Sequence, residues 1–148
     1  MRITSLHIDG FGVYCDQSFP ASGHSITVFH GPNEVGKSTV LEFIRMVLFG
    51  FPRRGANEHY PPLTGGHHGG RVEILSDDGT PFTFERHRGP HGGQLNVRSD
   101  GLDIRDDTLI NSLRGDLTGG AFQTILAFNL DNLTGLESAD DGDITSRI

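Results

Sequence analysis

Gly31-Pro32-Asn33-Glu34-Val35-Gly36-Lys37-Ser38-Thr39 is the stretch of this chain that decides its fold. It fits the pattern G-x-x-x-x-G-K-[ST] at every fixed position. In that pattern, successive backbone N–H groups and the positive end of the following helix converge on a polyphosphate. The stretch therefore predicts a phosphate-binding loop in which the residues from 31 to 39 contact a nucleotide.

The sequence on either side of this loop supports the prediction. Residues 25–30 (SITVFH) are β-branched and apolar, which is typical of a buried strand. Residues 40–49 are apolar nearly all round and are followed by Gly50 and Pro52, which favour the end of a helix. We expect a strand, the glycine loop and a buried helix in that order.

The cationic residue of the loop is unusual in this chain. All 12 Lys and Arg residues are arginine except Lys37. A compact ammonium group on a flexible stem can reach between β- and γ-phosphates, whereas a planar guanidinium would not fit the same loop. Ser38 would give its hydroxyl oxygen to Mg²⁺, and Gly31 and Gly36 would allow backbone angles and close approaches that a Cβ forbids. The expected ligands are Mg²⁺ and a nucleotide, and the loop by itself does not decide between ATP and GTP.

Length and composition limit the other functions. A chain of 148 residues is long enough for one domain with its own core. The formal net charge of −7 argues against a free-standing nucleic-acid binder, which needs clustered Lys and Arg. Cys15 is the single cysteine, so an internal disulfide is excluded and a reducing compartment is expected. No signal peptide or membrane-spanning run is evident, so we expect a cytoplasmic protein without a membrane partner.

The rest of the chain predicts mainly β-structure. Alternating and β-branched runs bounded by glycine turns indicate strands over residues 2–12, 13–19, 71–75, 81–86 and 94–98. The last three would form an antiparallel β layer over residues 71–99. Residues 51–70, rich in Gly and Pro, are expected to form an exposed loop with solvated histidines at His59, His67 and His68. The acidic residues 134–148 are expected to be a frayed tail.

Two more helical candidates and one basic spot follow from local signals. Residues 106–114 begin with acidic residues and end at a glycine, which indicates a short helix. Residues 121–130 are apolar enough to be buried, but their periodicity does not decide between helix and strand. Arg86, His87 and Arg88 form a basic spot that we interpret as a solvated face.

These motifs together resemble a known family. Met1-Arg2-Ile3 with a glycine turn near Phe11, the phosphate-binding loop, and Leu48-Phe49-Gly50 are similar to the N-terminal half of the ABC-type ATPase heads of the SMC, SbcC and RecF group, most closely its YhaN-like branch. The resemblance implies an α/β P-loop NTPase fold, with a mixed sheet around the loop helix beside the antiparallel layer. The chain would be the N-terminal lobe of a head, without the C-terminal lobe.

The same resemblance implies partners and a larger mechanism. In such heads a nucleotide lies between two heads, and hydrolysis moves attached coiled coils on DNA. A C-terminal lobe, a second head and DNA are therefore the implied partners. The resemblance also implies a glutamine near Mg²⁺ and the attacking water, at a place where this chain offers Asn129, with Gln123 a few residues early.

The family's remaining catalytic parts are not found in the sequence. Residues 117–120 imitate the signature motif and residues 125–131 imitate the acidic strand, but Asp131 is followed by Asn132, which is no general base. Residues 63–66 repeat the tetrapeptide of residues 117–120, which shows how readily this glycine-rich chain produces it. Without a general base and a second head, rapid hydrolysis is not expected.

Two other functions stay open at this stage. A small self-sufficient P-loop kinase or GTPase would need a second acidic Mg²⁺ ligand, and no Asn-Lys-x-Asp guanine reader is present. A nonenzymatic interaction module would keep the loop as a relict and bind a partner through its β layer. Steady turnover would favour the first, and function without Lys37 would favour the second.

Overall fold

The structure is a computed structural model that describes five stretches of the chain: residues 1–21, 27–32, 34–52, 60–115 and 117–122. The chain divides into two compact units, Met1–Leu117 and Thr118–Ile148. In the second unit the short helix α3 (Gly119–Ala121) is described, and the Thr118 side chain caps it by accepting a hydrogen bond from the Ala121 N–H.

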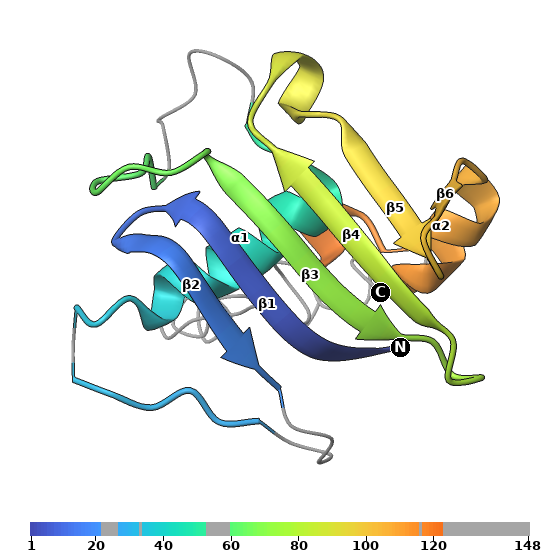
Figure 1. The fold of residues 1–148 in the computed structure, drawn as a ribbon, viewed down its shortest axis with the longest axis horizontal. Helices are drawn as coiled ribbons and strands as arrows, with labels where there is room; N and C mark the ends of the chain where they lie inside the picture. The colour runs from blue at the N-terminus through green and yellow to red at the C-terminus, as the bar shows by residue number, and fades with distance from the viewer. Residues whose placement is uncertain (22–26, 33, 53–59, 116, 123–148) are drawn as a thin grey trace, which may run out of the picture. The chain divides into compact units, whose positions relative to one another are not determined.

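A six-stranded antiparallel sheet forms the first unit (Figure 1). Its strands are β1 (Arg2–Phe11), β2 (Tyr14–Pro20), β3 (Gly69–Leu75), β4 (Pro81–His87), β5 (Leu95–Ser99) and β6 (Leu102–Ile104). They lie in the order β2-β1-β3-β4-β5-β6, and every neighbouring pair is antiparallel. Five of the six strands expected from the sequence are confirmed, and the three-residue strand β6 is an addition.

One face of this sheet is apolar because the strands alternate in character. Leu6 and Ile8 of β1 are buried, while His7 between them lies on the opposite, polar face. On that polar face the Ser5 hydroxyl donates to Glu73, and His7 bonds to the Ser18 hydroxyl. The period of two residues therefore assigns one face to the core and the other to solvent.

The helix after the loop covers the apolar face. Helix α1 (Lys37–Phe49) crosses behind the sheet in Figure 1 and packs against β1, β3 and β4. It ends at Gly50, whose φ of +108° favours glycine and whose N–H donates to the Met46 carbonyl. The helix expected over residues 40–49 is therefore confirmed and begins earlier, at Lys37.

Two short helical segments complete the first unit. Helix α2 (Asp107–Leu113) is capped by the Asp106 carboxylate, which accepts hydrogen bonds from the N–H groups of Thr108 and Leu109. The turn of 3-10 helix η1 (Pro90–Gly92) connects β4 to β5. The helix expected over residues 106–114 is confirmed, with Asp106 as its cap.

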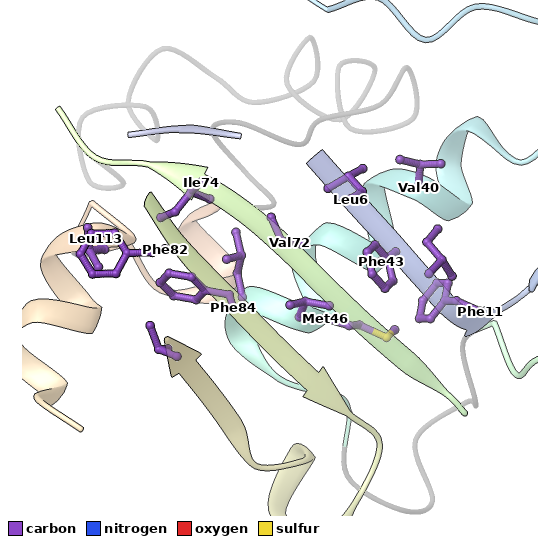
Figure 2. Close-up of a cluster of buried hydrophobic side chains, with 14 of the residues drawn as sticks. Leu6, Phe11, Val40, Phe43, Met46, Val72, Ile74, Phe82, Phe84 and Leu113 are labelled. Carbon is purple, nitrogen blue, oxygen red and sulfur yellow. The ribbon is translucent and has the colours of Figure 1, made fainter. Parts of the chain in front are cut away.

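The core lies between α1 and the sheet. In Figure 2, Phe43 and Met46 of α1 lie close to side chains of β1, β3 and β4. The Phe11 and Phe43 rings meet edge to face, with 5.6 Å between centroids. The buried apolar residues are Leu6, Ile8, Phe11, Val40, Phe43, Met46, Val47, Leu48, Phe51, Val72, Ile74, Phe82, Phe84, Val97, Ile110 and Leu113. This core holds the first residues of α1 in place, and so it positions the loop.

The prediction of a strand immediately before the loop is wrong for residues 27–30, the part of it that the structure describes. Residues 27–30 form no strand, and Val28 is 76% exposed. An apolar run becomes a strand only where a neighbour supplies hydrogen bonds, and none of the described strands pairs with these residues. The expected mixed sheet is likewise not observed in the described part, where the only parallel pairing is the isolated bridge between Gly10 and His68.

Two predictions about exposed basic side chains are also wrong. Arg86 is only 7% exposed, because it follows Phe82 and Phe84 on the inward face of β4. His68 packs against the rings of Phe11 and Phe51 rather than being solvated. His67 is exposed, as expected, and its ring stacks on that of His87, whereas His59 lies outside the described residues.

Candidate functional site

The predicted loop leads directly into the first turn of α1. Gly36 is the residue before the helix and has φ +97° and ψ 15°, a left-handed conformation that favours glycine. A Cβ on Gly31 would lie 2.8 Å from Val35 Cγ1, so the loop folds back and brings Val35 close to Gly31. Asn33 lies outside the described residues. Of the two fixed glycines of the pattern, Gly36 thus allows the left-handed backbone conformation, and Gly31 leaves room for the Val35 side chain.

The Lys37 side chain folds back over the loop. Its Nζ donates hydrogen bonds to the Gly31 carbonyl oxygen, at 2.8 Å, and to the Pro32 carbonyl oxygen, at 2.6 Å. These two bonds hold the only ammonium side chain of the protein against the first residues of the loop. Lys37 is therefore placed where an anion bound by the loop would meet a positive charge.

A hollow of about 310 Å³ lies at this place. Glu34, Gly36, Lys37, Ser38 and Thr39 line it, so it lies against the first turn of α1. The first N–H groups of a helix have no partner within the helix, and no side chain caps α1. Amide dipoles, an ammonium group and two hydroxyl groups therefore converge on a space of the size that small ligands occupy.

The two hydroxyl residues of the hollow differ in their surroundings. Ser38 is exposed, whereas Thr39 is buried at 6% exposure, and its methyl group would lie 2.8 Å from a Cβ at Gly12. A Mg²⁺ ion takes oxygen ligands and keeps several waters, so a hydroxyl open to solvent suits it better than a buried one. The chemistry of the hollow fits Mg²⁺ at Ser38 and phosphate oxygens at the amides.

A tyrosine outside the motif supports the loop. The Tyr14 hydroxyl, at the start of β2, donates to the Val35 carbonyl oxygen at 3.0 Å. Its ring lies edge to face with Phe19, which in turn contacts Phe29 before the loop. Sequence reasoning did not single out Tyr14, because its position along the chain gives no signal of a contact 21 residues away.

A second and larger hollow lies apart from the loop. It measures about 520 Å³ beside η1, and its lining includes His68, Arg88 and His91. The described residues that line it belong to neither the loop nor the first turn of α1. It is the larger of the two hollows, but the donors that suit a polyphosphate lie at the loop.

The comparison with known families decides the assignment. A sequence profile of a family described as AAA domain matches residues 1–138. The chain belongs to this AAA domain family. An AAA domain is a nucleotide-binding, ATPase-type region, and the α/β structure with an antiparallel sheet fits a P-loop ATPase fold.

A curated relative agrees with this assignment. The AAA domain is 30% identical over 133 residues to the uncharacterized protein YhaN of Bacillus subtilis (strain 168). The match covers 90% of this chain but 13% of the relative, so the chain spans about an eighth of that protein's length. The predicted resemblance to the N-terminal region of a YhaN-like ATPase of the SMC and SbcC type is confirmed.

The remaining predicted features of the AAA domain lie largely outside the described residues. Asn129 and Gln123, offered for the glutamine position, both fall there, as do residues 125–131 and the tail over 134–148. Among the described residues, no group of three or more His, Cys, Asp or Glu side chains is arranged to hold a metal ion. No helix in the described part of the chain has the length and apolar character needed to cross a membrane.

Proposed function

We propose that this AAA domain binds Mg²⁺ and ATP through residues 31–39, as the N-terminal nucleotide-binding lobe of a larger ATPase. The observation that carries the proposal is the placement of Lys37, which shares one hollow with the start of α1. The loop amides would hold the phosphate oxygens, Lys37 would neutralise their charge, and Ser38 would hold Mg²⁺. The bound ion would in turn screen the charge between the β- and γ-phosphates.

The wider role of the protein is part of the same proposal. The resemblance to the SMC and SbcC group supports a function in DNA repair or chromosome maintenance in the cytoplasm, with a C-terminal lobe and a second head completing the site. The net charge of −7 means that this chain contributes few cations to DNA binding. The lobe alone would bind nucleotide and hydrolyse little of it, because the resemblance places the general base and the second acidic Mg²⁺ ligand in the C-terminal lobe. Glu34, the acidic residue among the described residues that line the hollow, belongs to the loop itself.

Nucleotide titration of the 148-residue chain tests the proposal. We expect Lys37→Ala to weaken Mg²⁺-ATP binding at least tenfold, because a charge-assisted hydrogen bond contributes about 1.5–3 kcal/mol. Arg45→Met is the matched control, since Arg45 lies on α1 and pairs with Glu42 away from the loop. It removes the same charge and should leave the affinity unchanged.

The outcomes separate the alternatives. A wild-type chain that binds no ATP or GTP, or a Lys37→Ala chain that binds as well as Arg45→Met, would overturn the proposal. Steady turnover by the chain alone would instead favour a self-sufficient P-loop enzyme. A Ser38→Ala variant that loses affinity in Mg²⁺ but not in excess chelator would support the assigned metal ligand.

A further inference from the structure

We propose that Tyr14 is a positioning residue that aims the Gly36 N–H into the phosphate hollow. This inference rests on the proposed function, and it assigns a role to a side chain outside the loop motif. Tyr14 lies on β2, and its hydroxyl donates to the Val35 carbonyl oxygen at 3.0 Å. The contact is made to the peptide group that joins Val35 to Gly36.

The geometry of that peptide group carries the argument. It is trans, so its C=O and N–H bonds point in opposite directions within one rigid plane. A hydroxyl that holds the Val35 oxygen on one side therefore directs the Gly36 N–H to the other side. Gly36 lines the hollow, whereas Tyr14 is not among the described residues that line it. The amide consequently points away from Tyr14, toward the space where an anion would lie.

The fit between Tyr14 and Gly36 is close. A Cβ at Gly36 would lie 2.7 Å from the Tyr14 hydroxyl oxygen, so the tyrosine rests directly against the bare Cα. The ring is itself held by Phe19, with 5.3 Å between ring centroids. The hydroxyl that contacts the loop therefore comes from a residue of the sheet and not from the loop itself. A bond of this kind preorganises the donor before the ligand arrives, which reduces the ordering cost of binding.

The test compares Tyr14→Phe, which removes the hydroxyl and keeps the ring, with Tyr60→Phe as the matched control. Tyr60 is the other tyrosine of the chain, and its backbone oxygen accepts from the Gly12 N–H beside the same turn. Binding is measured with Mg²⁺-ATP and with inorganic tripolyphosphate. We expect Tyr14→Phe to weaken both ligands by the same factor, roughly three- to tenfold, and Tyr60→Phe to change neither.

A spectroscopic readout distinguishes positioning from general support of the fold. In the ligand-free chain, the Val35 carbonyl ¹³C and Gly36 amide resonances should shift in Tyr14→Phe, while resonances of the sheet core stay in place. In the titration, the Gly36 amide should respond less to tripolyphosphate than it does in the wild type. Unchanged Val35 and Gly36 resonances would overturn the proposed contact.

The remaining outcomes separate this inference from the proposed function. If Lys37→Ala loses binding while Tyr14→Phe binds like the wild type, the positioning role is overturned and the nucleotide site stands. If Tyr14→Leu weakens ATP but not tripolyphosphate, Tyr14 contacts the base instead, which also overturns the inference. A wild-type chain that binds neither ligand overturns the proposed function, and the positioning role with it.

Discussion

Asp9 and His87 meet across a strand that lies between them. The His87 Nε2 atom is 2.6 Å from Asp9 Oδ2, although the residues are 78 positions apart and their strands, β1 and β4, are not neighbours in the sheet. The intervening strand β3 places Gly69 and Gly70 at this level. A Cβ at Gly69 would lie 2.9 Å from His87 Cδ2, so the absence of a side chain at Gly69 leaves room for the contact between Asp9 and His87.

Replacing Asp9 with Asn should destabilise the sheet. The Asp9 carboxylate serves two imidazoles, since His7 Nε2 lies 3.0 Å from its other oxygen, and an amide offers only one acceptor oxygen. We expect Asp9→Asn to lower the free energy of unfolding by about 1–2 kcal/mol in urea denaturation. Asp100→Asn changes the same charge in an exposed turn and is the control. Equal losses in the two variants would contradict the prediction.

Alanine at Gly36 should cost more than alanine at Gly79. Both glycines have a positive φ, +97° and +86°, so each substitution strains the backbone by about 1 kcal/mol or more. A Cβ at Gly79 would meet nothing within 4 Å, whereas one at Gly36 would lie 2.7 Å from the Tyr14 hydroxyl. We expect Gly36→Ala to lose roughly 1–3 kcal/mol more stability, measured by urea denaturation, and to lose nucleotide binding. Similar stability in the two variants would show that the Tyr14 hydroxyl leaves room for a Cβ at Gly36, which contradicts the prediction.

Arg86 of β4 and Arg114, the residue that follows α2, should respond in opposite ways to replacement by methionine. The Nε atoms of both Arg86 and Arg114 are buried without a hydrogen-bond partner among the described residues, but Arg114 also donates through its Nη atoms, to the Leu48 carbonyl at 3.0 Å and to Asn111. We expect Arg114→Met to lose about 1–3 kcal/mol and Arg86→Met to be at least as stable as the wild type in urea denaturation. A large loss in Arg86→Met would show that its guanidinium is well compensated.

The same pair gives a pH dependence. Burial, with a smaller effect from the Arg114 charge, lowers the pKa of Arg86 to about 10, well below the usual range of a guanidinium. The folded chain therefore binds this proton less tightly than the unfolded chain does, and the wild type gains stability as the pH rises above about 10 toward the ordinary pKa of arginine. The stability difference between Arg86→Met and the wild type should shrink over this interval. A difference that is constant between pH 8 and about pH 11 would refute the shifted pKa.

Removal of the α2 cap should weaken that helix. Asp106 Oδ1 accepts from the Thr108 N–H at 2.9 Å and from the Leu109 N–H at 3.3 Å. Asp106→Ala should cost about 1 kcal/mol in thermal or urea denaturation, and Asp106→Asn should retain most of the stability because Asn also caps helices. If Asn and Ala are equally destabilising, the carboxylate acts through its charge rather than as a cap.

Features set by short-range signals could be predicted from the sequence. Gly50 ended α1, Asp106 began α2, and the glycine turn after Asp78 joined β3 to β4, because each depends on residues within one turn. The loop residues that line the hollow could likewise be named, since the motif specifies their spacing. Local chemistry was sufficient for these elements.

Features set by tertiary contacts were missed. Residues 27–30 have strand composition but no strand beside them in the described sheet, and β6 is too short at three residues to show a pattern. The Tyr14 contact with Val35 joins two segments whose sequences do not indicate each other. The inward position of Arg86 could have been predicted, because Arg86 continues the alternation of Phe82 and Phe84 along β4. Its charge favoured the interpretation as a solvated side chain instead.

The single thiol of the chain gives direct experimental access to the loop. Cys15 follows Tyr14 on β2, so the two side chains point to opposite faces of the strand, and the thiol is free and partly exposed. A maleimide fluorophore would attach there without any engineered cysteine, next to the residue that contacts Val35 yet facing away from it. Fluorescence from that one dye would follow occupancy of the neighbouring hollow in real time.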